Sequence, residues 1–371
     1  MDVNKGGAKR IRVGIIGANP DRGWAAQAHI PALKSLSNDF EITALSTSRR
    51  ESADAASKLF GVRIAFDNHQ DLVNRADVDV VAVTVKVPYH LELATAALHA
   101  GKAVYCEWPL GNGLIEAETL AALAKKKSVL AVVGLQARFA PSVAYVRDLI
   151  KQGYVGEVLS TTLIGSGMGW GPTVEPFNAY LNDKKNGATM LSIALGHAAD
   201  ALCHCLGEVR ELSATMTLRR KTFTIAGTGE RKAMTGDDQV CVTGLLEGGA
   251  AFSIHYRGGV SRGTNLLWEI NGTEGDLQLT AAGGQAQIFE MTARGGRETQ
   301  SSLEVLPVPE EYHWSPPQGP STNVAQAYAR FARDYREGTH FCPTFDDAVT
   351  RHRMLDAIET AAATGQRQAL G

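Results

Sequence analysis

Residues 11–24 read Ile-Arg-Val-Gly-Ile-Ile-Gly-Ala-Asn-Pro-Asp-Arg-Gly-Trp, and this stretch decides the fold of the first third of the chain. An apolar strand runs into a turn with two glycines, and an alanine-rich helical pattern follows. Glycines let a backbone approach a pyrophosphate, and a helix N-terminus offers N–H groups to the same anion. The order of strand, turn and helix therefore predicts a dinucleotide site with contacts from Gly17, Asn19, Arg22, Gly23 and Trp24. Asn19 replaces the usual second glycine, and asparagine tolerates left-handed backbone angles.

Strands and helices alternate along the rest of residues 1–135. Residues 77–85 are rich in valine with little polar alternation, which is typical of a strand buried on both faces of a parallel sheet. We therefore expect a doubly wound parallel sheet, a Rossmann domain, over residues 1–135. Its further strands are expected at 41–45, 64–66, 104–106 and 129–133, and its helices at 52–60, 90–100 and 114–127.

The end of the second expected strand reads Ser46-Thr47-Ser48-Arg49-Arg50. NAD sites usually place Asp or Glu about 20 residues past the glycines, where the carboxylate binds the ribose 2′-hydroxyl. Hydroxyls and arginines stand here instead, and a guanidinium pairs with a phosphate through two hydrogen bonds. The pattern favours NADP over NAD and predicts contacts from Ser46, Thr47, Ser48 and Arg49. A solvated helix start with Ser48 as its N-cap is the alternative.

Beyond residue 136 the pattern becomes a series of strands with few helices. Polar and apolar residues alternate within these strands, which indicates an antiparallel sheet with one face exposed. We expect a second domain over residues 136–371, so that the fold class is α/β followed by α+β. An apolar sheet face left in water would associate, which predicts a homodimer or a larger homo-oligomer. The expected strands lie at 157–163, 209–217, 239–246, 250–255, 266–270 and 276–280, the segment 219–236 is expected to be a solvated loop or hairpin tip, and the helices lie at 142–152, 187–206, 322–337 and 345–364.

The composition excludes several kinds of partner. The formal net charge is −2, and no basic tail or stripe stands out, so we expect neither nucleic acid nor a membrane to bind. No apolar signal segment and no run of about 18 apolar residues are present, which favours a cytoplasmic protein. The five cysteines are scattered in apolar segments and fit reduced core thiols. Cys203, His204 and Cys205 lack a second ligand pair, so no metal site is expected.

Four motifs are spread over the chain. They are Gly17-x-Asn19, Gly101-Lys102-x-Val104-x-x-Glu107-x-Pro109-Leu110, Gln136-x-Arg138-x-x-Pro141 and Gly153-x-x-Gly156-Glu157. Together they resemble the Gfo/Idh/MocA oxidoreductases, the family of glucose–fructose oxidoreductase and inositol dehydrogenase, over nearly the whole chain. The resemblance implies a nicotinamide cofactor, a carbohydrate-like small-molecule substrate, and a Rossmann domain followed by a large sheet that dimerises.

Three further features narrow the resemblance to one branch of that family. They are Asn19 with Gly23-Trp24, the pair Glu107-Trp108, and Gly196-His197-x-x-Asp200. They are most similar to the branch of the galactose-regulon repressor of yeasts and its fungal and bacterial homologues. That repressor binds a nicotinamide dinucleotide as a regulator and is not a working dehydrogenase.

Trp108 occupies the position of the family's catalytic lysine, because the usual Glu-Lys-Pro motif reads Glu107-Trp108-Pro109 here. An indole N–H donates a hydrogen bond but does not titrate near neutral pH, so it cannot replace a lysine in proton transfer. The family's acid four residues before the site histidine is also missing, and Ile193 stands there. We expect Trp108 to contact the nicotinamide end of the cofactor and to block the lysine chemistry.

The resemblance implies that His197 faces the nicotinamide and the substrate hydroxyl, where it could act as acid or base. Asp200 follows three residues later on the same side of the helix, so we expect it to orient or charge His197. Lys86 could bind the cofactor ribose or phosphate, replace the missing lysine, or be an exposed loop residue. Tyr180 and Trp170, in a segment rich in glycine, proline and aromatic residues, could line a sugar pocket or pack a loop.

His90, Glu107 and Gln136 complete the expected cofactor contacts, and for His90 a cap or supporting role fits better than catalysis. Two functions stay open. The first is an NADP-linked oxidoreductase acting on a sugar, polyol or related carbonyl, with His197 as proton carrier and Lys86 or Tyr180 as helper. The second is a cofactor-bound, catalytically inactive sensor or transcriptional regulator.

Overall fold

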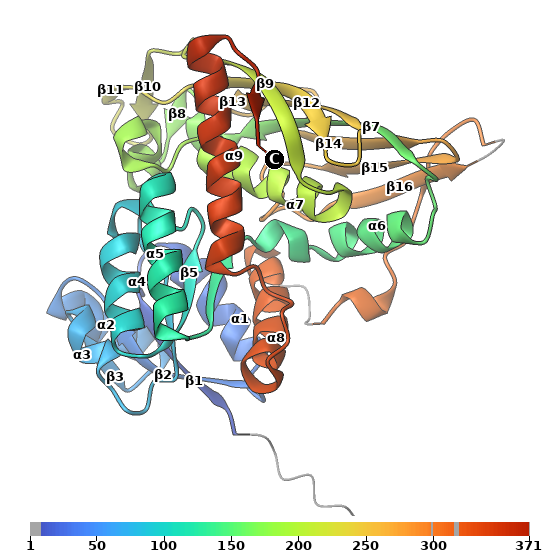
Figure 1. Cartoon of the computed structure of the whole chain (residues 1–371). Helices are drawn as coiled ribbons and strands as arrows, with labels where there is room; N and C mark the ends of the chain where they lie inside the picture. Colours follow the sequence, from blue (N-terminus) through green and yellow to red (C-terminus); the bar gives the residue numbers. More distant parts are fainter. Residues whose placement is uncertain (1–8, 298–299, 315–318, 371) are drawn as a thin grey trace, which may run out of the picture. The chain divides into compact units, whose positions relative to one another are not determined.

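The computed structural model describes residues 9–297, 300–314 and 319–370 (Figure 1). They divide into two compact units. Unit 1 takes its described residues from 1–110, 119–134 and 314–345, and unit 2 takes them from 111–118, 135–313 and 346–371. We expected a single boundary between residues 135 and 136. The chain instead returns to unit 1 near its end, because helix α8 (Thr322–Glu337) packs against helix α1 (Ile30–Ser35).

Unit 1 contains a six-stranded sheet with the order β3-β2-β1-β4-β5-β6, and its strand pairs are all parallel. The strand order reverses between β1 and β4, and ligands of doubly wound sheets bind at the carboxyl ends of the strands near such a point. This confirms the expected Rossmann domain. The strands are β1 (Ile11–Ile16), β2 (Phe40–Ser46), β3 (Ile64–Phe66), β4 (Val80–Val83), β5 (Ala103–Glu107) and β6 (Ala131–Gly134), and further helices are α2 (Arg50–Phe60), α3 (His69–Val73), α4 (His90–His99) and α5 (Leu114–Lys127).

Unit 2 is built on a nine-stranded sheet with the order β17-β16-β15-β14-β7-β13-β12-β9-β18. Strands β7 and β13 pair in parallel and the other pairs are antiparallel, which confirms a large, mostly antiparallel sheet. The strands are β7 (Val158–Gly167), β9 (Val209–Thr217), β12 (Gln239–Leu246), β13 (Ala251–Gly258), β14 (Leu266–Gly272), β15 (Gly275–Ala281), β16 (Thr292–Arg297), β17 (Glu304–Val305) and β18 (Gln368–Ala369). The alternation in 292–297 is interrupted by two glycines, so the sequence did not predict β16.

One face of this large sheet is buried beneath α6 (Pro141–Lys151) and α7 (Gly196–Leu206). Val143 of α6 and Ala198 of α7 line a small cavity together with Leu163 and Trp268 of the sheet. The opposite face is partly exposed. One of its cross-strand rows consists of Thr215, Cys241, His255, Ile164, Leu267, Thr280 and Thr292. This face mixes hydroxyl-bearing and apolar side chains and is therefore less apolar than the alternation indicated.

The polar segment 219–236 forms a hairpin, as expected, and not a solvated loop. Strands β10 (Thr222–Ile225) and β11 (Arg231–Ala233) pair with each other, and β8 (Thr173–Val174) completes a three-stranded sheet. This sheet has a small core of its own, made by Val174, Phe223, Ile225 and Met234.

The five cysteines are free thiols, and four of them are buried as expected. Cys241 is exposed, which corrects its assignment to the core, because its position in β12 points to the open face of the sheet. Among the described residues, no helix combines the length and the apolar character that crossing a membrane requires.

Candidate functional site

The glycine-rich loop follows β1 and has the backbone that a dinucleotide site needs. Gly17 has φ +101°, and a Cβ atom there would lie 2.8 Å from Val85 Cγ1 and 3.0 Å from the carbonyl oxygen of Thr84. Only glycine fits both the left-handed conformation and this close approach. Asn19 organises the loop beyond it, because its side-chain oxygen accepts hydrogen bonds from the backbone N–H groups of Asp21 and Arg22. The replacement of the second glycine by Asn19 thus adds a cap inside the loop.

Trp24 ends this loop and begins the next helical turn, the π-helical turn η1 (Ala25–His29). Single π-turns within helices often occur at functional sites. The indole Nε1 of Trp24 is buried without a hydrogen-bond partner among the described residues, while Arg22 is exposed. Both residues stay predicted cofactor contacts, and the Trp24 N–H is a donor that a ligand could use.

The segment after β2 separates into supporting and exposed residues. Ser46 is buried, its hydroxyl donates to the carbonyl of Asn68, and its own carbonyl accepts from Gly17. Ser46 therefore supports the glycine loop from below and does not present its hydroxyl as we expected. The N-cap of α2 is Arg49 and not Ser48, and no side chain caps the helix.

The two arginines after β2 differ in their surroundings. Arg50 donates to the carbonyl of Ala65 and pairs with Asp54. Arg49 is exposed, and its guanidinium has no hydrogen-bond or ion-pair partner in the described part of the chain. The hydroxyl of Thr47 donates a hydrogen bond to the backbone carbonyl of Arg49. Arg49 is thus the guanidinium of this segment that is available for a phosphate.

The loops after β4 and β5 are tied together by His90. Its Nδ1 lies 2.7 Å from the carbonyl oxygen of Pro109, and its Nε2 lies 3.0 Å from that of Val85. Both ring nitrogens therefore face backbone carbonyls, which agrees with a supporting role. Lys86 is exposed just before the turn η2 (Val87–Tyr89) and stays a candidate. Trp108 is 4% exposed, joined to Pro109 by a cis peptide bond.

Glu107, the last residue of β5, has a partner that the sequence did not reveal. His29 is completely buried, and its Nε2 lies 2.9 Å from Oε1 of Glu107. The signal available in the sequence was a single histidine in an alanine-rich helical pattern, which does not by itself indicate a function. The contact joins the helix after the glycine loop to the strand end that precedes Trp108.

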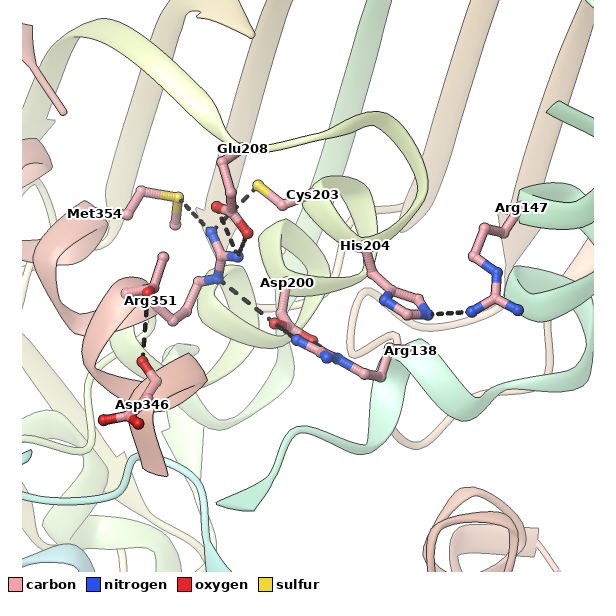
Figure 2. Close-up of polar contacts among 10 residues, drawn as sticks. Arg138, Arg147, Asp200, Cys203, His204, Glu208, Asp346, Arg351 and Met354 are labelled. Carbon is pink, nitrogen blue, oxygen red and sulfur yellow. Dashed lines mark hydrogen bonds and ion pairs between the residues drawn. The ribbon is translucent and has the colours of Figure 1, made fainter. Parts of the chain in front are cut away.

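The predicted pairing of Asp200 with His197 is wrong. Both residues lie on α7 and both are buried, but the Asp200 carboxylate accepts hydrogen bonds from Arg138 at 2.8 and 2.5 Å. Arg351 Nε lies 3.5 Å from the same carboxylate (Figure 2). Among the described residues, the hydrogen-bond and ion-pair partners of the Asp200 side chain are these arginines and not His197. A two-pronged guanidinium is a stronger partner for a buried carboxylate than an imidazole one turn away.

The charges around Asp200 balance. Arg351 is 1% exposed and donates to both carboxylate oxygens of Glu208, at 2.8 and 3.0 Å, in addition to facing Asp200. Burial alone would raise the pKa of the Asp200 carboxyl, but the charge and hydrogen bonds of Arg138, together with Arg351, lower it overall. The carboxylate form of Asp200 thus fixes α7 to the segment that carries Arg138 and to α9 (Phe345–Thr364).

His204, one residue from Cys203 and Cys205, is held as a neutral ring. Its Nε2 lies 2.7 Å from Nη1 of Arg147 (Figure 2). Burial, followed by the charges of Arg138 and Arg147, lowers the pKa of His204 to about 3. Burial likewise raises the pKa values of Cys203 and Cys205 to about 12, so both stay thiols. A cation beside His204 does not suit a metal ligand.

The other predicted residues of unit 2 lie in different surroundings. Tyr180 lies in the turn η5 (Pro176–Asn182), and burial raises its pKa to about 12, so its hydroxyl can donate but cannot act as a base near neutral pH. Trp170 is buried and donates to the carbonyl of Leu181, which makes it a packing residue of this loop. Gln136 is buried at the start of η3 (Gln136–Phe139) and stays a prediction, as does His197 after the π-turn η7 (Leu191–Leu195).

Comparison with known proteins separates the chain into two matched regions. Residues 11–135 match the oxidoreductase family with an NAD-binding Rossmann fold, GFO_IDH_MocA. Residues 141–281 match the C-terminal domain of Gal80p. The first match covers the Rossmann sheet, and the second covers most strands of the nine-stranded sheet.

Three of the proteins that are similar to this chain differ in their identity to it and in their coverage. Dehydrogenase aclE of Aspergillus oryzae is 32% identical over 385 residues, covering 97% of this chain and 98% of its own. The galactose/lactose metabolism regulatory protein GAL80 of Saccharomyces cerevisiae is 29% identical over 318 residues, covering 78% and 73%, and a super-repressor mutant of it superposes with a TM-score of 0.88 at 24% identity over 98% of both chains. Levoglucosan dehydrogenase of Pseudarthrobacter phenanthrenivorans is 25% identical over 96% of this chain and 97% of its own, and a levoglucosan dehydrogenase structure with NADH and L-sorbose superposes with a TM-score of 0.86 at 21% identity over 98% and 99%.

The resemblance noted in the motifs is thereby confirmed over the whole length. The glycine loop, the Rossmann sheet and the mostly antiparallel second sheet are those of the matched families. The chain belongs to the Gfo/Idh/MocA oxidoreductase family, with an NAD-binding Rossmann domain and a C-terminal domain of the Gal80p kind.

Proposed function

We propose that this protein is an NADP-linked oxidoreductase acting on a sugar, a polyol or a related carbonyl compound. One observation carries the proposal. The chain keeps the family's glycine loop and its histidine at position 197, although Trp108 replaces the lysine. The full-length similarity to dehydrogenase aclE and the levoglucosan dehydrogenase structures with NADH support an enzyme with a carbohydrate-like substrate.

The nicotinamide, when bound, supplies or accepts the hydride at its C4 atom. The protein must then hold or move one proton at the substrate oxygen. Trp108 cannot titrate near neutral pH, and Tyr180 keeps its hydrogen because its pKa is raised to about 12. We assign the proton transfer to His197, with Tyr180 or Lys86 as a hydrogen-bond donor to the substrate or the cofactor.

NADP preference rests on Arg49. Arg49→Ala should weaken NADPH binding about 10- to 100-fold, because a charge-assisted pair with the 2′-phosphate is lost, and should leave NADH binding within about 2-fold. Calorimetric titration of each variant with both cofactors measures this. Arg50→Ala is the matched control, since Arg50 pairs with Asp54 and Ala65. Tighter binding of NADH by the wild type, or an unchanged NADPH affinity in Arg49→Ala, contradicts the preference.

A second function has its own support. Trp108 and Ile193 replace both members of the family's lysine–acid pair, and residues 141–281 match the Gal80p C-terminal domain. In this alternative the protein is a cofactor-bound regulator without turnover, and His197 is a ligand contact. Full cofactor affinity with no turnover distinguishes it from the enzyme.

We also propose that the open face of the nine-stranded sheet forms a homodimer. Light scattering at micromolar concentration should give twice the mass of one chain. Leu267→Glu, in the row with Ile164, should shift the mass toward the monomer, because a buried unpaired carboxylate opposes association. Leu159→Glu is the control, since Leu159 is exposed on β7 and alternation places it on the other face. A monomeric wild type would contradict the proposal.

A further inference from the structure

The contact between His29 and Glu107 is one part of a longer hydrogen-bond chain inside unit 1. The hydroxyl of Tyr328, on α8, lies 2.8 Å from Nδ1 of His29, and Nε2 of the same ring faces Glu107. Tyr328 and His29 are completely buried, and Glu107 is 8% exposed. These hydrogen bonds join three segments that are far apart in the sequence, and they end at Glu107, the residue before Trp108.

The direction of the chain follows from its hydrogens. Burial, followed by the charge of Glu107, raises the pKa of Tyr328 well above its usual value, so the phenol keeps its hydrogen. His29 Nδ1 is the acceptor that the described residues offer to this hydroxyl. If the hydroxyl accepted instead, its hydrogen would be buried without a partner, which is costly. Tyr328 therefore donates to Nδ1, and the Nε2–H of His29 donates to the Glu107 carboxylate.

The contact with His29 holds the Glu107 side chain in one orientation. Oε1 of Glu107 accepts from Nε2 of His29, and one carboxylate can accept several hydrogen bonds at once. The Glu107 side chain is 11% exposed and stands at the carboxyl end of β5, the edge at which doubly wound sheets bind their ligands. Ring packing also holds the His29 imidazole in place, because it lies edge-on to both Tyr105 and Tyr328.

We propose that Tyr328 and His29 are positioning residues that aim the Glu107 carboxylate at a hydrogen-bond donor on the nicotinamide half of the cofactor, its carboxamide N–H or a ribose hydroxyl. The inference rests on the proposed cofactor binding and deepens it. It also explains why the chain returns to unit 1 after residue 314. The cofactor site of the Rossmann unit is incomplete without the hydroxyl that α8 supplies.

Two tyrosines allow a matched test. Tyr105 stacks on Tyr328 with ring centroids 4.8 Å apart and is 1% exposed, but its hydroxyl has no hydrogen-bond partner among the described residues. Tyr328→Phe and Tyr105→Phe each remove one buried oxygen from the same aromatic cluster. In calorimetric titrations of the full chain with NADPH and NADH, we expect about 5- to 20-fold weaker binding for Tyr328→Phe and a change within about 2-fold for Tyr105→Phe.

A conservative replacement separates positioning from packing. The amide of His29→Gln can accept from Tyr328 and donate to Glu107, so it should stay within about 5-fold of the wild type, whereas His29→Leu should lose about 10- to 100-fold. The fluorescence of bound reduced nicotinamide should change in His29→Leu and Tyr328→Phe and not in Tyr105→Phe. The thermal unfolding midpoint of each protein shows whether the variant is folded under the conditions of the titration.

Equal affinities of the Tyr328→Phe and Tyr105→Phe proteins would overturn the positioning role while cofactor binding by the wild type still stands. Equal losses in His29→Gln and His29→Leu would overturn it as well, because packing alone would then explain the effect. A wild type that binds neither NADPH nor NADH would instead overturn the proposed function, and the positioning role with it.

Discussion

His197→Ala is expected to lower turnover by about 10²- to 10⁴-fold, the usual loss when a general acid or base is removed. Transfer of a hydride to or from a carbinol carbon needs a proton carrier at the oxygen. Trp108 does not titrate near neutral pH, Ile193 has no proton to exchange, and the raised pKa of Tyr180 keeps that phenol protonated. Cofactor affinity should stay within about 3-fold, because the contacts with the pyrophosphate and the ribose phosphate are assigned to the Rossmann unit.

His204→Gln is the matched control for this experiment. His204 lies on the same helix and is a histidine too, but Arg147 occupies its Nε2 and its pKa is lowered to about 3. Turnover of His204→Gln should therefore equal that of the wild type under conditions in which both are folded. A His197→Ala enzyme with full turnover would remove His197 from the mechanism.

Asp200→Asn is expected to destabilise the protein by about 3–5 kcal/mol, which is the effect of removing one partner of a buried ion pair. Asp200 is fully buried and Arg138 holds it with two hydrogen bonds, so the amide leaves a buried guanidinium without its carboxylate. The Asp200 pKa is lowered in the fold, so its contribution is present above the unfolded pKa of about 4 and is lost as the pH falls through the folded value. Urea unfolding at neutral pH measures the full difference.

Glu208→Gln makes the same chemical change on the other side of Arg351. The Glu208 side chain is 42% exposed, and Asp200 still faces the buried Arg351 in this variant, so we expect a smaller cost, about 1 kcal/mol. Similar free energies of unfolding for Asp200→Asn and Glu208→Gln would show that burial does not set the value of these ion pairs.

The fold could be predicted from the sequence because its signals are local. Strand β3 and helix α5 have the expected bounds, and the buried valine run at 77–85 contains β4. The return of α8 to unit 1 could not be predicted from the sequence. It depends on ring contacts of Tyr328 and Phe331 with Tyr105, and of Tyr328 with Phe40, and contacts between such distant residues leave no local pattern. Strand β16 was missed because Gly295 and Gly296 interrupt its alternation.

The candidate site likewise has features that could be predicted from neighbouring residues and features that could not. The glycine loop and the position of Trp108 depend on residues adjacent in the sequence, and both could be read from it. The partners of Asp200 could not, because Arg138 and Arg351 lie 62 and 151 residues away and a helix offers an apparent partner at His197 three residues off. His29 and Tyr328 were missed for the same reason, since each gains its meaning from a contact made only in the fold.

The central claim is that this chain transfers hydride without the family's lysine. The direct measurement follows the absorbance of reduced nicotinamide when the wild-type protein is mixed with oxidised NADP and a panel of sugars and polyols, and in the reverse direction with NADPH and the matching carbonyl compounds. Formation or consumption of NADPH over many turnovers, lost in His197→Ala, is the predicted result. Tight NADPH binding with no turnover on any substrate in either direction would contradict the claim and favour the regulator.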